Sequence, residues 1–384
     1  MPHLRIQKKP RSPWASQSFL TAGLLLVLAS GMLFGRTGIA IAYCSAALML
    51  LVSLGSQVCR SSWSEFGTIS AAVIYLIAGL SVFSHARFAV PYAFGTFILS
   101  GLAFQLTRDL TPIDVALRRA YQCAFVSTIC GLLFFPGGAV GLEQLVPGVS
   151  SNGIPCLLLL LTLTRAVVAI HGGRSLPVIQ SLLCVGISLI GGGRTNLYLG
   201  VASLFVLLLL DSHRRRKKWL FCIALLVAAL VCFEYQIEIY SWLVRSTKVG
   251  VGLDTPRWDL WGEYIQKLDG FQVVFGGSYE GTAIRSEYQG NVHSSLIRAH
   301  HHFGLLGLLL LLMGIAISSA RSFKLGLANG AAVSALSLLL LVRLAFDDVG
   351  FPCPLDLLTF IVIYASFHNR VRSCTTKYWV FAPI

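Results

Sequence analysis

The chain has 384 residues, of which 55% are hydrophobic and only 12% are charged. Because soluble domains carry about 25% charged residues, this composition argues against a water-soluble globular protein. The formal net charge of +14 does not indicate nucleic-acid binding, because the basic residues lie in short loops between apolar segments, a pattern that reports membrane topology.

Apolar segments recur along almost the whole chain. A bilayer core of about 30 Å needs roughly 20 apolar residues per helix, and many of these segments approach that length. We therefore predict an all-α fold, a single polytopic membrane domain over residues 1–384 with about twelve transmembrane helices. The predicted spans cover residues 18–34, 38–55, 68–84, 92–106, 120–138, 154–170, 176–190, 195–211, 219–233, 303–320, 327–345 and 353–368.

The loops between these spans differ in charge. With the N-terminus in the cytoplasm, nearly every basic cluster falls inside, including Arg118, Arg119 and the run from Arg214 to Lys218. The outer loops at 141–155 and 346–354 contain neither Lys nor Arg. By the positive-inside rule, this distribution predicts an even number of spans with both termini in the cytoplasm.

Residues 234–302, between the ninth and tenth predicted spans, are rich in charges, aromatic residues and glycines. The same alternation makes this segment a large extracytoplasmic loop. Within it, the sequence TPRWDLWGEYIQKL predicts an amphipathic helix that is capped by Thr255, has Pro256 in its first turn and lies at the membrane interface.

A histidine motif closes this loop. His293 and Ser294 are followed by nine residues, Gly304, two residues and Gly307. An imidazole just outside the membrane can act as a general base near neutral pH, because its unperturbed pKa is about 6.5. The alternative is an interfacial histidine without a chemical role.

Two arginines on the outer side run against the charge bias. Arg194 lies in GGGRTNLYLG, between the seventh and eighth spans, and Arg257 lies near the start of the predicted amphipathic helix. A guanidinium group binds phosphate oxygens bidentately, and a helix N-terminus also favours an anion, so both are candidate phosphate ligands. The alternatives are an Arg194 side chain that reaches lipid headgroups and a helix anchored by Trp258 and Trp261.

Other chemistry has little support in the sequence. Most of the ten cysteines lie in or beside apolar segments without a CxxC pair, which favours helix packing over disulfides. The run His300, His301 and His302 lacks an accompanying acidic pair, so we interpret it as polar cover at the interface and expect no metal. Neither a Walker-type loop nor a dinucleotide-binding motif occurs, and no cofactor is expected.

Together these motifs resemble those of the O-antigen ligase and O-antigen polymerase superfamily, bacterial polytopic glycan transferases that use undecaprenyl diphosphate-linked donors. The resemblance rests on the His293 motif, on Arg194 in RTNL, and on Arg257 followed four residues later by Trp261 and then by FGGS at 275–278. It covers residues from about 190 to 310 in motif detail and the rest in topology, and GGGR departs from the more usual small-Ser-Arg-Gly form.

The resemblance implies a metal-independent, inverting glycosyltransferase of the bacterial inner (cytoplasmic) membrane with a periplasmic active site. His293 is then the catalytic base, and Arg194 and Arg257 bind the donor diphosphate. The implied partners are an undecaprenyl diphosphate-linked glycan donor, a lipid A core or lipid-linked glycan acceptor, membrane lipids and a chain-length regulator, but no nucleic acid.

Three alternatives stay open. The helix count and loop position favour a ligase that transfers to lipid A core, although a repeat-unit polymerase shares the donor chemistry. A non-enzymatic transporter of lipid-linked glycans predicts charged residues along an intramembrane path, which the spans largely lack. A structural or assembly protein leaves the histidine spacing and the two outer arginines unexplained.

Overall fold

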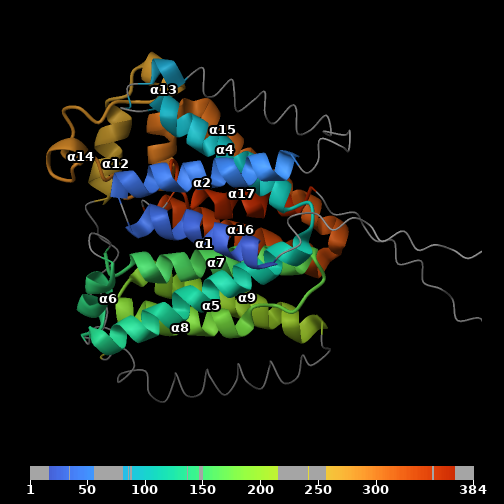
Figure 1. Cartoon of the computed structure of the whole chain (residues 1–384). Coiled ribbons are helices and arrows are strands. Elements are labelled where there is room, and N and C mark those ends of the chain that lie inside the picture. The colour runs from blue at the N-terminus through green and yellow to red at the C-terminus, as the bar shows by residue number, and fades with distance from the viewer. Residues whose placement is uncertain are drawn as a thin grey trace, which may run out of the picture.

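The computed structural model describes residues 17–33, 35–55, 81–84, 86, 89–135, 137–146, 150–214, 241, 257–347 and 350–367. Within these ranges all regular secondary structure is helical, as predicted. The long helices pack into one bundle, and the short helices α12 and α14 lie together at one of its ends (Figure 1).

The helices follow the apolar segments of the sequence. The first group comprises α1 (Gln17–Leu33), α2 (Gly35–Gly55), the 3-10 turn η2 (Ser81–Phe83), α4 (Ala89–Leu106), α5 (Leu110–Phe134), α6 (Ala139–Leu145), α7 (Gly153–His171), α8 (Val178–Gly191) and α9 (Arg194–Arg214). The second comprises α12 (Arg257–Gln266), α13 (Gly270–Phe275), α14 (Ala283–Ser286), α15 (Ser295–Ser322), η4 (Phe323–Leu325), α16 (Leu327–Ala345) and α17 (Asp356–Ala365). Ten of the twelve predicted spans coincide with a helix; residues 68–80 and 219–233, which belong to the other two, lie outside the described residues.

Several of these helices fit a multi-pass membrane protein. In the described part of the chain, five segments are long and apolar enough to cross a bilayer: Ala89–Leu106, Gly153–His171, Arg194–Asp211, Ser295–Leu325 and Leu327–Ala345. A sixth arises if α5 and α6, which are bent by 112° relative to each other, form one broken span. The total of twelve spans remains a prediction.

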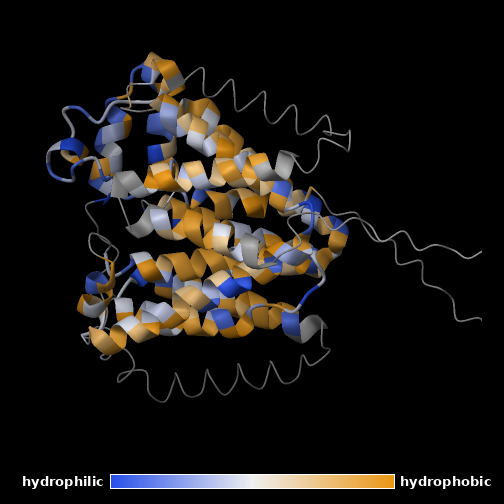
Figure 2. Cartoon of the chain, in the orientation of Figure 1, coloured by the Kyte–Doolittle hydropathy of each residue, from blue (hydrophilic) through white to orange (hydrophobic). Residues whose placement is uncertain are grey.

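Apolar side chains cover much of the outside of the bundle. Ile179 and Leu182 on α8, and Leu309 and Met313 on α15, are exposed. Figure 2 shows hydrophobic residues along the bodies of the long helices and more hydrophilic residues over α12 and α14. Because large exposed apolar surfaces are unfavourable in water, these helix faces suit contact with lipid chains.

Helix α7 lies at the centre of the bundle. Every residue from Ile154 to His171 is buried except Leu157. The helix packs against α5, α8, α9, α16 and α17. A helix that is apolar on all sides is expected to be surrounded by other helices, and α7 follows this rule.

Two helices begin earlier than their apolar spans. α5 begins at Leu110, because the carboxylate of Asp109 accepts a hydrogen bond from the Thr111 amide at 2.9 Å. Arg118 and Arg119, which we predicted in a loop, therefore lie within α5. α15 begins at Ser295, eight residues before the predicted span, and the histidine run is part of it.

The predicted amphipathic helix is present as α12. Its buried residues Leu260 and Tyr264 form a small apolar core with Tyr279, Ile284 and Val292. Trp258 and Ile265 are exposed instead. The predicted cap, Thr255 and Pro256, lies outside the described residues. Residues 257–294 thus have a core of their own at the end of the bundle.

Charged side chains are also buried between the helices, which the sequence interpretation did not anticipate. Arg165 on α7 donates through Nε to Asp114 Oδ1 on α5 at 3.1 Å and through Nη1 to Gln180 Oε1 on α8 at 2.8 Å. Arg174 reaches the other carboxylate oxygen of Asp114 at 3.4 Å. A buried charge requires such partners, because its desolvation is otherwise uncompensated.

Asp114→Ala should lower the stability of the protein by about 3 kcal/mol, because it leaves the buried Arg165 guanidinium without its carboxylate. Thermal unfolding of the purified protein in detergent measures this loss. The double variant Asp114→Ala/Arg165→Leu should recover much of it, since both charges are then absent. A double variant that is less stable than Asp114→Ala alone would contradict this account.

Candidate functional site

The turn that follows α16 joins three parts of the chain. Arg343, in the last turn of α16, forms an ion pair with Asp347. Arg257, the first residue of α12, donates from Nη1 to the Phe346 carbonyl at 2.7 Å. Ser295, the first residue of α15, donates to the Asp347 carbonyl from its amide at 2.9 Å and from Oγ at 2.6 Å. The starts of α12 and α15 are therefore fixed to the same turn.

One carboxylate and two guanidinium groups act on Arg257 among the described residues. Its guanidinium is partly buried, and this burial is the main cause that lowers its pKa. The Asp347 carboxylate opposes the shift, whereas the positive charges of Arg343 and Arg194 lower the pKa further. An arginine remains protonated in proteins even so. Arg194 and Arg343 are thus both close enough to Arg257 to influence it, and Asp347 is the carboxylate that acts on Arg257 among the described groups.

Arg194 begins α9 directly after a sharp hairpin. Gly192 ends α8 in the left-handed conformation, with φ of 68°, which only glycine adopts without strain. Arg194 follows two residues later, at the N-terminus of α9. Its Nη1 atom is buried and has no hydrogen-bond partner among the described residues. This geometry leaves a buried donor available to a ligand.

His293 lies in the loop between α14 and α15, half-buried, with a φ of 51°. Its amide donates to Asn291 Oδ1 at 3.0 Å, and its ring meets the edge of Tyr288 at 5.8 Å between centroids. The preceding carbonyl, of Val292, accepts a hydrogen bond from Trp261 Nε1 on α12 at 2.9 Å. Ser294 caps α15 through Ile297. α12 and the turn after α16 therefore hold the backbone on both sides of His293.

The structure thus places Arg194 close enough to Arg257 for their charges to interact. The loop of His293 is attached through Ser295 to the turn after α16, which also accepts a hydrogen bond from Arg257. Arg343 is a further member that the sequence analysis missed. Its signal was present in the sequence, because an arginine inside an otherwise apolar span is a candidate functional residue. Arg343 is 1% exposed, and its Nε also lies 3.1 Å from Cys156 Sγ.

The histidine run is buried, so its interpretation as polar cover at the interface was wrong. His300, His301 and His302 are each between 7% and 8% exposed. Because the Gly277 amide donates to Tyr264 Oη at 3.1 Å, the Tyr264 hydroxyl can donate to His300 Nδ1 at 2.8 Å. His300 Nε2 then donates to the Val273 carbonyl at 2.8 Å. This assignment fixes the tautomer of His300.

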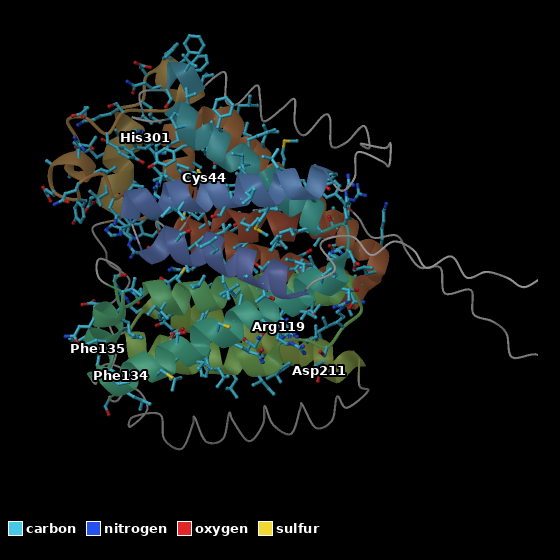
Figure 3. The ribbon with its side chains drawn as sticks, viewed as in Figure 1. Cys44, Arg119, Phe134, Phe135, Asp211 and His301 are labelled. Atoms are coloured by element: carbon cyan, nitrogen blue, oxygen red, sulfur yellow. The ribbon has the colours of Figure 1, made fainter. Side chains whose placement is uncertain are left out.

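The neighbouring histidines also pack inside the protein. His301 Nδ1 donates to the Gly277 carbonyl at 2.5 Å, and its ring stacks on Tyr279 at 3.8 Å between centroids. The ring of His302 meets the edge of Tyr92 on α4 at 5.2 Å. Figure 3 shows His301 at the end of the bundle that carries α12 and α14. The run therefore ties α15 to α12, α13 and α4.

Gly304 interrupts α15 below the histidines. Its φ of 65° and ψ of −171° are not helical. A Cβ at this position would lie 2.1 Å from the carbonyl oxygen of Val274 on α13, so only glycine permits the approach of the two backbones. Gly276, in the FGGS segment, approaches the carbonyls of His300 and His301 in the same way. The FGGS segment and the glycine of the histidine motif thus meet in one contact.

The described residues contain no group of three His, Cys, Asp or Glu side chains arranged to hold a metal ion. No family model matches the chain, and no curated protein is significantly similar to it. The superfamily resemblance therefore remains a prediction from motifs.

Gly304→Ala should destabilise the protein by at least about 2 kcal/mol, because the new Cβ meets the Val274 carbonyl and the residue keeps a positive φ. Unfolding in detergent, followed by tryptophan fluorescence, measures the effect. Gly186→Ala on α8 is the matched control, since its Cβ meets nothing within 4 Å. It should be neutral or slightly stabilising. Equal stability of the two variants would rule out the tight contact between α13 and α15.

Proposed function

We propose that the protein is a metal-independent glycosyltransferase that moves a glycan from undecaprenyl diphosphate to a sugar hydroxyl at the periplasmic face of the bacterial inner membrane. The observation that supports this most is the charge of the site. Arg194 and Arg343 both act on Arg257, and Asp347 is the opposing carboxylate among the described groups; such a gathering of guanidinium groups suits a diphosphate.

The arrangement supports a direct displacement at the anomeric carbon of the donor sugar. Arg194 and Arg257 hold the diphosphate and stabilise the negative charge that develops on it. The acceptor oxygen forms a bond to the anomeric carbon on the opposite side, and the bond from that carbon to the diphosphate oxygen breaks with its electron pair. His293 accepts the proton of the acceptor hydroxyl as general base. A single displacement of this kind inverts the anomeric configuration.

The proposed topology has twelve spans, both termini in the cytoplasm, and residues 234–302 in the periplasm. It is supported by the direction of α9, which runs from Arg194 beside the site to the basic cluster that starts at Arg214. Figure 3 shows Asp211, near this second end, toward the side of the bundle away from His301. A helix that runs in this direction is what the positive-inside rule expects if the site is at the outer face and the basic sequence after α9 is at the inner face.

The favoured acceptor is a lipid A core sugar, which makes the protein an O-antigen ligase. A repeat-unit polymerase, which elongates a lipid-linked chain, is the alternative and uses the same donor site. Purified protein with an undecaprenyl diphosphate-linked glycan, offered either a lipid A core acceptor or more donor, separates the two by gel. A chain-length regulator is a partner that the polymerase reading favours. Absence of both products would leave a non-enzymatic transporter of the lipid-linked glycan.

His293→Ala should lower the transfer rate by about 10²-fold or more, because the acceptor hydroxyl then has no general base. The initial rate with saturating donor measures this loss. Binding of the donor and the melting temperature should stay close to those of the wild-type protein, since the hydrogen bond from the His293 backbone amide to Asn291 is kept in this variant. Full activity of His293→Ala would remove His293 from the mechanism.

Arg194→Lys and Arg257→Lys should each raise the KM for the donor about ten-fold, because a lysine keeps the charge but loses the planar fork that binds phosphate. Arg285→Lys on α14 is the matched control: it is exposed and pairs only loosely with Glu280, at 3.6 Å. Its KM should not change. Equal effects at all three positions would indicate that any exchange of arginine for lysine raises the KM, and would rule out a defined diphosphate site at Arg194 and Arg257.

A further inference from the structure

Two asparagines meet beside Arg194, at the corner where α7 and α9 begin. Asn152 directly precedes α7, and Asn196 lies in the first turn of α9. Asn196 Nδ2 donates to the backbone carbonyl of Asn152 at 3.0 Å. The side chain of Asn152 turns toward the α8–α9 hairpin, because its Oδ1 lies 1.8 Å from where a Cβ on Gly193 would be. Only glycine leaves room for this amide.

Three polar atoms at this corner are buried without a partner among the described residues: Asn152 Oδ1, Asn196 Oδ1 and Arg194 Nη1. Asn196 is only 1% exposed, so the cost of an unpaired carbonyl there is considerable. Buried polar groups in native proteins are nearly always satisfied by protein, water or ligand. The described residues therefore leave hydrogen-bonding capacity at this corner unused.

The chemistry of the three atoms selects the ligand. Two amide oxygens accept hydrogen bonds and would repel a phosphate oxygen, whereas the guanidinium of Arg194, which lies two residues before Asn196 in α9, donates to one. A group that presents hydroxyl donors to the amides and an anionic oxygen to Arg194 satisfies all three atoms. A sugar joined to a diphosphate is such a group, with ring hydroxyls beside the phosphate.

We infer that Asn152 and Asn196 bind hydroxyl groups of the first sugar of the lipid-linked donor, the sugar attached to the diphosphate. This subsite rests on the proposed function, because Arg194 must hold that diphosphate. It gives the donor site a means to recognise the reacting sugar itself and to orient its anomeric carbon. An ordered water that satisfies the same atoms is the competing explanation.

The test compares two ligands, an undecaprenyl diphosphate-linked glycan and undecaprenyl diphosphate without sugar, each titrated against purified full-length protein in detergent. Asn152→Ala is the main variant, since it removes one unpaired oxygen and keeps the backbone carbonyl that holds Asn196. Asn196→Leu removes the second oxygen at similar volume. Asn329→Leu, in the first turn of α16, is the matched control. The Asn329 side chain donates from Nδ2 to the Leu325 carbonyl at 2.9 Å, so this variant also replaces a hydrogen-bonded amide by an apolar side chain.

Asn152→Ala and Asn196→Leu should each weaken binding of the glycan-bearing ligand about ten-fold and leave binding of the sugar-free ligand within about two-fold. Arg257→Lys should weaken both ligands, and Asn329→Leu neither. Retained binding of the sugar-free ligand also shows that a variant is folded. If Asn196→Leu loses this binding, the result for Asn152→Ala decides whether the sugar subsite is present.

Two results overturn the subsite. If the asparagine variants bind both ligands as the wild-type protein does, or lose both equally, the amides do not contact the sugar and water occupies the corner. In that case the diphosphate site stands, provided that the wild-type protein binds both ligands and Arg257→Lys weakens them. If the wild-type protein binds neither ligand, the proposed function fails, and the subsite fails with it.

Discussion

The ion pair between Arg343 and Asp347 is the interaction on which the arrangement of the candidate site depends. Arg343 is almost fully buried, so its charge is tolerated only while Asp347 lies against it. That requirement fixes the turn after α16. The turn in turn presents the Phe346 carbonyl to Arg257 and the Asp347 carbonyl to Ser295. A single desolvated charge in the bundle thus positions two segments that are distant from it in sequence.

The sequence predicted the places of the long described helices better than their ends. Hydropathy locates residues that prefer lipid or a protein core, and ten predicted spans coincide with helices for this reason. It does not locate polar helical turns. α5 and α15 both begin in polar sequence, where Asp109 and Ser294 cap their first amides. Capping is a local signal that can be recognised in a sequence, but only when the search extends beyond the apolar segment.

The candidate site was predictable in part. Arg194, Arg257 and His293 were selected because their residue types and positions departed from the expected pattern of an outer loop. Arg343 carried a similar signal that was missed, because it is an arginine inside an apolar span. Asn196 could not be selected in that way, because its burial against Asn152 depends on a contact that no local pattern encodes. The histidine run was misinterpreted because polar residues were taken to be exposed. In the interior, the Tyr264 hydroxyl and the Gly277 carbonyl provide hydrogen-bond partners for His300 and His301.

The broken helix α15 also gives meaning to the nine residues between Ser294 and Gly304. Ser294 fixes where this helical segment starts, and the contact of Gly304 with Val274 fixes where it stops. At about 1.5 Å and 100° per residue, the segment spans about 13.5 Å and places the His300 ring toward Tyr264. Inserting or deleting one residue would rotate the helical residues before the change by about 100°, more than a quarter of a turn, relative to the residues after it. The nine-residue spacer therefore sets both the distance between the loop of His293 and the break at Gly304 and the direction in which the helical segment between them turns its side chains.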